Sequence, residues 1–520
     1  MNGAEALVHT LLDAGVDTCF ANPGTSEMHF VAALDRIAGM RCVLGLFEGV
    51  VTGAADGYYR MAQRPAGTLL HLGPGLANGL ANLHNAKKAR SGILNIVGEH
   101  ATGHLALDAP LTSDIEGLAR PMSHWVRTIA STQRIAADGR EAVAQACARP
   151  GRIATLVLPA DMAWSEVAHA PPAGGAVHEA APAAVDEEAV RTAAELLRRA
   201  GPRTLLLLGG RALRSRATDW AGRIAAATGC TVMSEFYAER IERGAGRVGV
   251  PRVPYAVDAA LQVLSAFDHV VLVQAVPPVA FFAYPGKPGR LAPPGTRCHV
   301  LATHEQDAQE GLHMLCEHLG ATRAQAATAE RLQPRPEHED GPLTPAGIGT
   351  LLASLIPENA IVVDEAITTG RAFNAATRDA APHDWLTNMG GAIGYGLPVA
   401  VGAAIAAPGR RVIALEGDGS AMYTLQALWT MARESLDVTV LVFANRSYQI
   451  LRGEFAQVGA GAPGRRAHDM LGIDRPALDW VALGTGHGVP ACRVTTLGEL
   501  ADALRRCLAM EGPGLIEVVL

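Results

Sequence analysis

Short apolar runs alternate with amphipathic segments along most of the chain, which is the pattern of an α/β protein. The clearest example lies within Arg410–Leu451. Arg411–Leu415 predicts a short apolar strand, and Asp437–Phe443 predicts a second one that is rich in Val and Leu. A helix is expected between them, from Ser420 to about Arg433. Two strands joined in this way form a βαβ unit, so we expect them to be parallel with a right-handed crossover.

The same alternation occurs in three parts of the chain, which two Pro-rich stretches separate. These stretches, 169–185 and 326–342, predict exposed linkers. The sequence therefore predicts three doubly wound, parallel-sheet α/β domains, at residues 1–168, 186–330 and 344–520.

Two local features of these domains follow from the residue pattern. In the first domain, the strand Gly67–His71 is expected to end in a loop, Leu72–Gly75, before the next helix. Four strands are expected in the middle domain, at 204–208, 230–233, 268–273 and 298–301.

The composition excludes several classes of protein. Of the residues 49% are hydrophobic and 18% charged, and the net charge of −7 comes without a basic block, which argues against a nucleic-acid partner. The eight Cys form no CxxC pair and predict reduced thiols in a cytoplasmic protein. The N-terminal segment does not have the pattern of a signal peptide, and no apolar run is long enough to predict a membrane span.

Polar residues follow both strands of the βαβ unit, where open α/β sheets bind ligands. Gly417, Asp418 and Gly419 turn the chain after the first strand, and Asn445 follows the second. Carboxylate and amide oxygens suit Mg²⁺, which also binds substrate phosphates. The amides expected at the helix N-terminus form an anion site, and they belong to Gly419, Ser420 and Ala421. The pattern predicts a diphosphate held through a divalent metal.

A second candidate site is Glu48, which starts a predicted helix after an apolar strand. Small apolar residues surround it in the sequence, and a carboxylate in such a setting can relay protons. The alternative is a structural role, because a Glu in the first helical turn is also favoured by the helix dipole.

Together these motifs resemble those of thiamine diphosphate (ThDP) enzymes of the acetolactate synthase, pyruvate oxidase and benzoylformate decarboxylase type. The Gly-Asp-Gly turn, a helix, an apolar strand and Asn445 match the cofactor motif, with Ser420–Ala444 intervening. The resemblance covers nearly the whole chain. It implies a pyrimidine-binding, a middle and a diphosphate-binding domain, with ThDP and Mg²⁺ as cofactors and a 2-oxo acid as substrate. It further implies a homodimer or homotetramer, with active sites between the first domain of one subunit and the third of another.

The resemblance also assigns roles to single residues. Glu48 would hydrogen-bond N1′ of the aminopyrimidine and so promote removal of the proton from thiazolium C2. The carbonyl of Gly391 would accept from the 4′-amino group, and Ile393 would separate the two rings. The other implied cofactor contacts are Gly417, Asp418, Gly419, Ser420, Ala421, Asn445, Thr368 and Tyr448, and the implied metal ligands are Asp418, Asn445 and the backbone carbonyl of Ser447.

The reaction is indicated by Thr25 and His71, which resemble active-site positions of benzoylformate decarboxylase. His can shuttle protons near neutral pH, and with Glu48 these two residues are the catalytic candidates. The alternative for His71 is a structural strand-end histidine. A second histidine that this enzyme carries in its middle domain is absent from 275–285, where Phe281 and Phe282 predict an apolar wall.

Three functions stay open. The favoured one is non-oxidative 2-oxo acid decarboxylation, and the alternative is carboligation of the acetolactate synthase type, since Gly-Pro-Gly after His71 is similar to that enzyme. The third is a catalytically silent ThDP-fold binding protein, against which the intact Glu48, Asp418 and Asn445 argue. FAD in the middle domain is not favoured, because Gly209 and Gly210 follow a strand without a GxGxxG motif.

Overall fold

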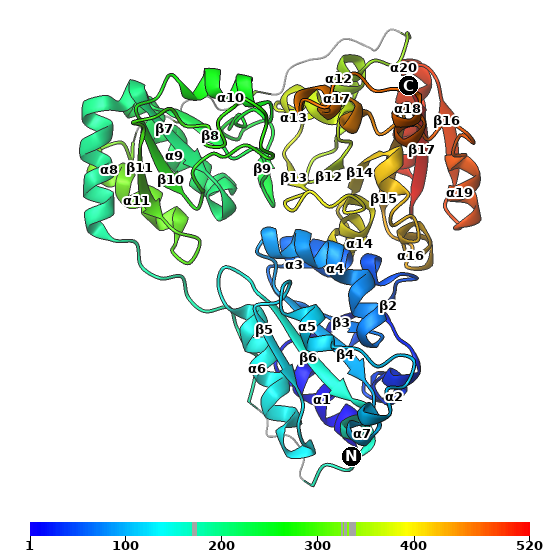
Figure 1. Ribbon diagram of the computed structural model, residues 1–520. Helices are drawn as coiled ribbons and strands as arrows, with labels where there is room; N and C mark the ends of the chain where they lie inside the picture. The colour runs from blue at the N-terminus through cyan, green and yellow to red at the C-terminus, as the bar shows by residue number, and fades with distance from the viewer. Residues whose placement is uncertain (169–173, 324–325, 327–329, 332–339) are drawn as a thin grey trace.

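The structure is a computed structural model that describes residues 1–520 except 169–173, 324–325, 327–329 and 332–339 (Figure 1). Part of the first predicted linker and most of the second therefore lie outside the described residues. Among the described helices, none is both long and apolar enough to cross a bilayer. The chain forms three sheets, and the two termini lie at opposite ends of the molecule (Figure 1).

The first sheet has six parallel strands in the order β2-β1-β3-β4-β6-β5. The strands are β1 Thr18–Asn22, β2 Arg41–Leu44, β3 Ala66–Leu70, β4 Ile93–Glu99, β5 Trp125–Thr128 and β6 Ile153–Pro159. The helices are α1 Gly3–Asp13, α2 Met28–Arg36, α3 Glu48–Ala62, α4 Leu72–Lys88, α5 Ile115–Ala119, α6 Ile135–Cys147 and α7 Ala160–Trp164. The edge strand β5 was not among the predicted strands. All four of its residues are half-buried, so the strand lacks the alternation of buried and exposed positions by which a strand is recognised.

The predicted loop Leu72–Gly75 is wrong, since these residues form the first turn of α4. Leu72 is fully buried and has a φ of 45°, so the reversal of direction takes place within a single residue. Pro74 is tolerated in the first turn because its missing N–H has no partner there anyway. The sequence Gly-Pro-Gly is typical of a loop, but the burial of Leu72 favours the helix.

The second sheet has four parallel strands in the order β11-β10-β7-β8. They are β7 Thr204–Leu208, β8 Thr231–Ser234, β10 His269–Val273 and β11 Arg297–Ala302, which confirms the four predicted strands to within a residue or two. Its helices are α8 Glu187–Ala200, α9 Ser215–Thr228, α10 Val257–Leu264 and α11 Ala308–His318.

The third sheet has seven strands in the order β16-β17-β15-β14-β12-β13-β9. They are β9 Ile241–Arg243, β12 Ile361–Glu365, β13 His383–Thr387, β14 Val412–Gly417, β15 Val438–Ala444, β16 Ala491–Val494 and β17 Gly514–Val519. The helices are α12 Pro345–Leu355, α13 Phe373–Ala376, α14 Gly396–Ala406, α15 Asp418–Ala421, α16 Ala427–Arg433, α17 Gln449–Gln457, α18 Arg465–Leu471, α19 Trp480–Gly486 and α20 Leu497–Ala509. Strand β9 comes from the middle of the chain and pairs antiparallel with β13.

The parallel pair β14–β15 confirms the predicted βαβ unit, but the helix inside it is not continuous. It begins at Asp418, stops after Ala421 and resumes at Ala427. In the gap, the Thr424 hydroxyl donates to the carbonyl of Gly394 at 3.0 Å. The predicted end at Arg433 is confirmed, but the expected continuity from Ser420 is wrong. Residues 422–426 leave the helical repeat, and in this turn Thr424 bonds to a neighbouring loop instead.

The first and third sheets are joined by the crossing of α3 and α14, which face each other in Figure 1. A Cβ atom built on Gly57 would lie 2.1 Å from the carbonyl oxygen of Val399, and one on Gly402 would lie 1.8 Å from that of Ala54. The helices thus touch through backbone. Their buried residues belong to one hydrophobic core that includes both sheets.

At the end of α3, Arg60 contacts all three parts of the chain. Its guanidinium is buried against Asp56 and donates to the carbonyl oxygens of Thr387 at 2.7 Å and Glu239 at 3.2 Å. It also donates to the hydroxyl of Tyr395 at 2.9 Å. This residue fixes the first sheet against the other two.

The backbone contact between α3 and α14 predicts the effect of Gly402→Val. A branched side chain cannot fit against the Ala54 carbonyl, so the helices must separate, and we expect the thermal midpoint to fall by roughly 5–10 °C. Gly486→Val is the control, because nothing lies within 4 Å of a Cβ at that helical position. Differential scanning fluorimetry measures both variants, and equal midpoints would contradict the close contact.

Candidate active site

The carboxyl ends of β14 and β15 place Asp418 and Asn445 on neighbouring strands of the third sheet. Asp418 is only 3% exposed, and its two oxygens accept from the amides of Gly419 at 2.9 Å and Arg446 at 2.6 Å. The Asn445 side-chain oxygen accepts from the amide of Ser447 at 3.0 Å. These bonds fix the side chains at the strand ends, next to the turn that Gly417 begins.

Among the described residues, none forms an ion pair with the Asp418 carboxylate. Burial raises its pKa to about 6, even though the two amides that it accepts from act in the opposite direction. A buried carboxylate beside a neutral amide oxygen is a donor set that suits Mg²⁺. Ser447 is buried two residues beyond Asn445, so its carbonyl belongs to the same turn. These residues fit a divalent metal.

The loop that follows β13 is held by the side chain of Asn388. Its oxygen accepts from the amides of Gly390 and Gly391, and its nitrogen donates to the carbonyl of Ala392 at 2.7 Å. Gly391 has a φ of 77°, a conformation that favours glycine. Ile393, in the same loop, lines the large cavity described below. Thr368 caps a 3₁₀-helix (Thr369–Ala372) after β12 and does not line this cavity.

Behind this loop lie two buried carboxyl groups that sequence reasoning missed. Glu365 and Glu416 are directly opposite on the parallel strands β12 and β14, and they are 2% and 0% exposed. Glu365 accepts from the amides of Tyr395 and Gly396 and from Asn388. Burial raises the pKa of Glu365 to about 7, and burial together with Glu365 raises that of Glu416 well above its usual range. The pair therefore favours retention of a proton, and the amide bonds that Glu365 accepts hold the loop to the sheet.

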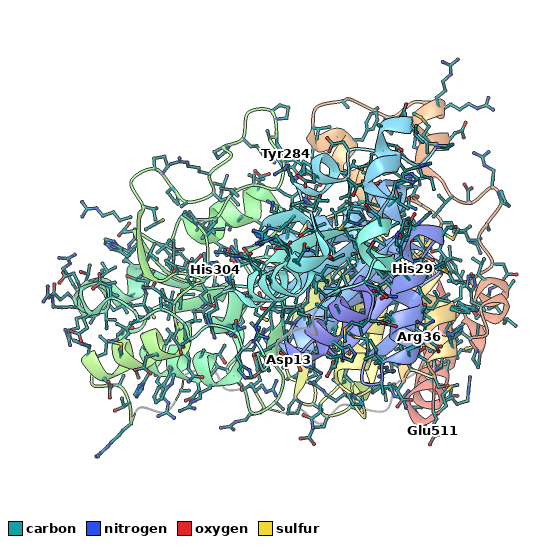
Figure 2. All side chains as sticks on the ribbon, turned by 90° about the horizontal axis from the view of Figure 1, so that it is seen from below. Asp13, His29, Arg36, Tyr284, His304 and Glu511 are labelled. Carbon is teal, nitrogen blue, oxygen red and sulfur yellow. The ribbon has the colours of Figure 1, made fainter. Side chains whose placement is uncertain are left out.

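A cavity of about 1400 Å³ lies between the second and third sheets. Gly391, Ile393 and Tyr448 line it, and the aromatic wall expected from Phe281 and Phe282 is present. Figure 2 shows Tyr284 where the middle part of the chain meets the C-terminal part. There its hydroxyl donates to Glu454 at 2.9 Å, so this bond joins the segment of the aromatic wall to the C-terminal part of the chain.

The remaining candidates lie at the carboxyl edge of the first sheet. Glu48 begins α3, is 7% exposed and accepts from the side chain of Asn78 at 3.0 Å. His71 precedes α4, and its Nδ1 lies 2.7 Å from a carboxylate oxygen of Glu27. Thr25 is exposed and begins the short 3₁₀-helix that ends at Glu27. Glu27 was missed because nothing in the sequence links it to a residue 44 positions away.

Glu27 orients the histidine ring within a tightly fitted site. Its carboxylate is buried and also accepts from the amide of Gly24 at 2.8 Å, while its second oxygen has no hydrogen-bond partner among the described residues. A Cβ on Gly24 would lie 2.2 Å from Nδ1 of His71, and one on Gly98 would lie 1.7 Å from Glu27. Both glycines are therefore needed for the Glu27–His71 contact.

Within one chain, the two groups of candidates are not brought together. The described residues that line the large cavity all come from Gly222 onward and include Gly391, Ile393 and Tyr448. Glu48, His71 and Thr25 are not among them, and neither are Asp418 and Asn445. The first group offers proton-transfer chemistry and the second an anion and metal site.

The end of β7 does not offer room for a dinucleotide. A Cβ on Gly209 would lie 2.5 Å from the carboxylate of Glu235, and the side chain of Gln274 accepts from the amide of Arg211 at 2.8 Å. The cavity beside Gly210 measures about 40 Å³. The chain's own side chains fill the space at the end of β7, so these residues do not fit a dinucleotide there.

Comparison with known proteins decides the family. The model of the thiamine pyrophosphate enzyme N-terminal TPP binding domain matches residues 1–118, and that of the C-terminal TPP binding domain matches residues 368–518. A Mycobacterium tuberculosis protein with the provisional name acetolactate synthase large subunit IlvX is 51% identical over all of this chain and 99% of its own length. The chain belongs to the ThDP-dependent enzymes.

Other members of this ThDP family extend the likeness. Benzoylformate decarboxylase of Pseudomonas aeruginosa is 30% identical over 97% of this chain and 96% of its own. The solved 4-hydroxybenzoylformate decarboxylase of Rhodococcus jostii superposes with a TM-score of 0.82 at 25% identity, covering 99% of this chain and 98% of the other. The three-sheet architecture is thus that of ThDP-dependent enzymes.

The shared proton of Glu365 and Glu416 predicts a pH dependence of stability. Because folding raises the pKa of both groups, their contribution is complete near pH 4.5 and is lost as the pH rises towards 7. Gln cannot ionise and can donate to Glu365, so Glu416→Gln should raise the thermal midpoint at pH 8 by about 2–4 °C, roughly 1 kcal/mol. At pH 5 the variant should match the parent.

The control for this measurement is Glu511→Gln, at an exposed position that Figure 2 labels at the edge of the molecule. It should leave both midpoints unchanged. A loss of stability in Glu416→Gln that is equal at pH 5 and pH 8 would exclude the shared proton.

Proposed function

We propose that this chain is a ThDP- and Mg²⁺-dependent enzyme that decarboxylates a 2-oxo acid without oxidation. The observation that carries the proposal is the Glu27–His71 contact, which presents an oriented imidazole at the carboxyl edge of the first sheet. Decarboxylation followed by aldehyde release needs a group that takes up and returns protons, and histidine does so near neutral pH.

The cofactor would be held by the residues of the third sheet. When bound, ThDP supplies an electron sink for the bond that breaks next to the carbonyl group. Asp418, Asn445 and the carbonyl of Ser447 would bind Mg²⁺ and through it the diphosphate. The loop held by Asn388 would position the rings through Gly391 and Ile393. The remaining proposed contacts are Gly417, Gly419, Ser420, Ala421, Thr368 and Tyr448.

The first sheet of a second subunit would complete the site. Glu48 and His71 do not line the large cavity of their own chain, and both lie at a sheet edge that carries exposed apolar residues such as Leu46. We therefore propose at least a homodimer, in which Glu48 of one subunit reaches the cofactor of the other. A homotetramer would contain two such pairs.

The histidine would transfer protons through Nε2. Since Nδ1 is held by the Glu27 carboxylate, a neutral His71 carries its proton on Nδ1 and leaves Nε2 free to accept. After it has accepted, the same atom can return the proton to the product. Thr25 would contribute its hydroxyl to substrate binding beside it.

A second candidate is carboligation of the acetolactate synthase type. It is favoured by the provisional name of the M. tuberculosis relative, at 51% identity. In this case a second carbonyl compound replaces the proton as the acceptor. A catalytically silent binding protein is the remaining alternative, and the intact acidic residues Glu48 and Asp418 argue against it.

Product analysis separates the three. The purified protein, with ThDP and Mg²⁺, is assayed for CO₂ and by product NMR against pyruvate, branched 2-oxo acids and benzoylformate. An aldehyde as sole product supports decarboxylation. A 2-hydroxy ketone or an acetohydroxy acid would assign the chain to carboligation. If no substrate is consumed and no CO₂ is released across a broad panel, the binding protein is favoured.

Glu48→Gln tests the proton relay. Glutamine keeps the size and the contact with Asn78 but cannot hold the negative charge, so we expect kcat to fall roughly 10²–10⁴-fold while ThDP still binds. Glu187→Gln is the control, since it also replaces the first residue of a helix. A turnover close to that of the parent would remove Glu48 from the mechanism.

Asp418→Asn tests the metal site. We expect the variant to lose Mg²⁺-dependent retention of ThDP on gel filtration, because the amide keeps the shape but not the charge. In the parent, retention should weaken as the pH falls through about 6, where Asp418 takes up a proton. Asp502→Asn, on the exposed face of α20, is the control. Undiminished ThDP binding by Asp418→Asn would refute the assignment.

A further inference from the structure

The large cavity has more room than a cofactor needs. Its volume of about 1400 Å³ exceeds the roughly 300–1,000 Å³ that is usual for small-molecule sites. Its lining includes Gly391 and Ile393, at the proposed cofactor loop, and also Arg243 and Arg252 from the segment that contains β9. A substrate that extends away from the reacting carbon could therefore lie inside it.

Aromatic rings connect the two ends of this cavity. A Cβ on Gly391 would lie 2.7 Å from the ring of Phe281, so this ring abuts the cofactor loop. Phe281 is 5.7 Å from Tyr237, and Tyr237 is 4.6 Å from Phe236, measured between ring centroids. The guanidinium of Arg252 lies over the Phe236 ring at 4.9 Å. The result is a continuous aromatic surface that ends on a positive charge.

A second guanidinium lies at the same end. Arg243, on β9, is 8% exposed and packs over Trp385 at 5.1 Å. One of its terminal nitrogens donates to the carbonyl of Asn374, and the other is buried without a hydrogen-bond partner among the described residues. The Arg252 side chain lies over Phe236, and among the described residues it also has neither a hydrogen bond nor an ion pair. A buried donor without a partner costs free energy, which points to a ligand.

The acidic side chains nearby act on these arginines through their charge, Asp364 on both and Glu330 on Arg243, but among the described residues neither forms an ion pair with them. The Asp364 carboxylate accepts from the indole of Trp385 at 3.3 Å and from an amide at 3.2 Å, and burial raises its pKa. Glu330 lies 3.8 Å from a different arginine, Arg378. At this end of the cavity, Arg243 and Arg252 therefore offer guanidinium groups without an ion-pair partner among the described residues, which suits an anion.

We propose that this cavity selects 2-oxo acids that carry a second anionic group at the far end of an aromatic or long apolar acyl chain. The reacting 2-oxo group would lie at Gly391 and Ile393, the chain along the aromatic surface, and the distal carboxylate or sulfonate on Arg252 and Arg243. This inference rests on the proposed function, whose substrate class it specifies.

The test compares matched pairs of substrates. Benzoylformate is compared with its para-carboxylate, and 2-oxohexanoate with 2-oxoadipate, in the assembled enzyme with ThDP and Mg²⁺. We expect the dianionic member of at least one pair to have a KM roughly tenfold to a hundredfold lower, the range for one charge-assisted hydrogen bond. Raising the ionic strength should narrow the difference.

Variants of Arg252 then assign the effect. Arg252→Gln should remove the preference by raising KM for the dianionic acid alone, and Arg252→Lys should restore part of it. Arg433→Gln is the matched control, because Arg433 also lies over an aromatic ring, Trp429 at 5.2 Å, but does not line the cavity. Equal KM values within every pair, or an equal effect of Arg252→Gln on both members, would overturn the proposal.

Binding without turnover separates this inference from the proposed function. If no 2-oxo acid reacts, the thermal midpoint is measured with terephthalate and with benzoate, which cannot be decarboxylated by this chemistry. Stabilisation by terephthalate alone that Arg252→Gln abolishes would support the anion subsite even if the reaction is wrong. Equal responses to the two acids would overturn it, as would one tightly bound flavin per chain in the purified protein.

Discussion

The buried ion pair between Arg60 and Asp56 is the contact on which the arrangement of the molecule depends. The arginine belongs to the first sheet, yet its donors reach Thr387 and Tyr395 of the third and Glu239 of the middle part. Asp56 is also bonded to Ser91, which fixes the pair within its own sheet. Removing one partner of such a pair costs about 3–5 kcal/mol, because the other charge is left buried. Tyr395 belongs to the loop that leads into α14, so the same arginine also orders the loop of the proposed cofactor site.

Buried polar groups on the strands of the third sheet also hold the loop that precedes α14. Glu365 accepts from three donors of the segment 388–396 and shares a proton with Glu416, which is otherwise without a hydrogen bond in the described chain. Two carboxyl groups at this depth are tolerated only if one is protonated, since both charges together would be too costly. Rigid placement of Gly391 and Ile393 thus depends on a proton that is held by side chains of the sheet beneath the loop.

The proposed site is divided between surfaces that the chain folds separately. The third sheet supplies a buried acid, an amide oxygen and a preformed glycine loop, while the first supplies Glu48 and the Glu27–His71 contact. Glu48 is fixed inside its own part of the chain by the bond from Asn78, whereas the glycine loop is also held by the first part, for example by the bond from Asn85 to the carbonyl of Ala392. Assembly of two chains would then join two rigid halves, so that little further ordering is needed.

The sequence alone determined the parts that depend on neighbours along the chain. The alternation of apolar runs predicted the strands of the middle part and the βαβ unit, and the turn at Asp418 with Asn445 predicted polar groups on adjacent strand ends. These features follow from local geometry, because parallel neighbouring strands bring their carboxyl ends to one edge.

Only the tertiary structure decided which distant residues meet. It placed β9 in the third sheet, Glu27 against His71, Glu365 opposite Glu416 and Arg252 at the end of an aromatic surface. It also broke the predicted helix where Thr424 bonds to Gly394. In each case the deciding contact joins residues that no local pattern links, because burial and hydrogen bonding act between residues that only the complete fold brings together.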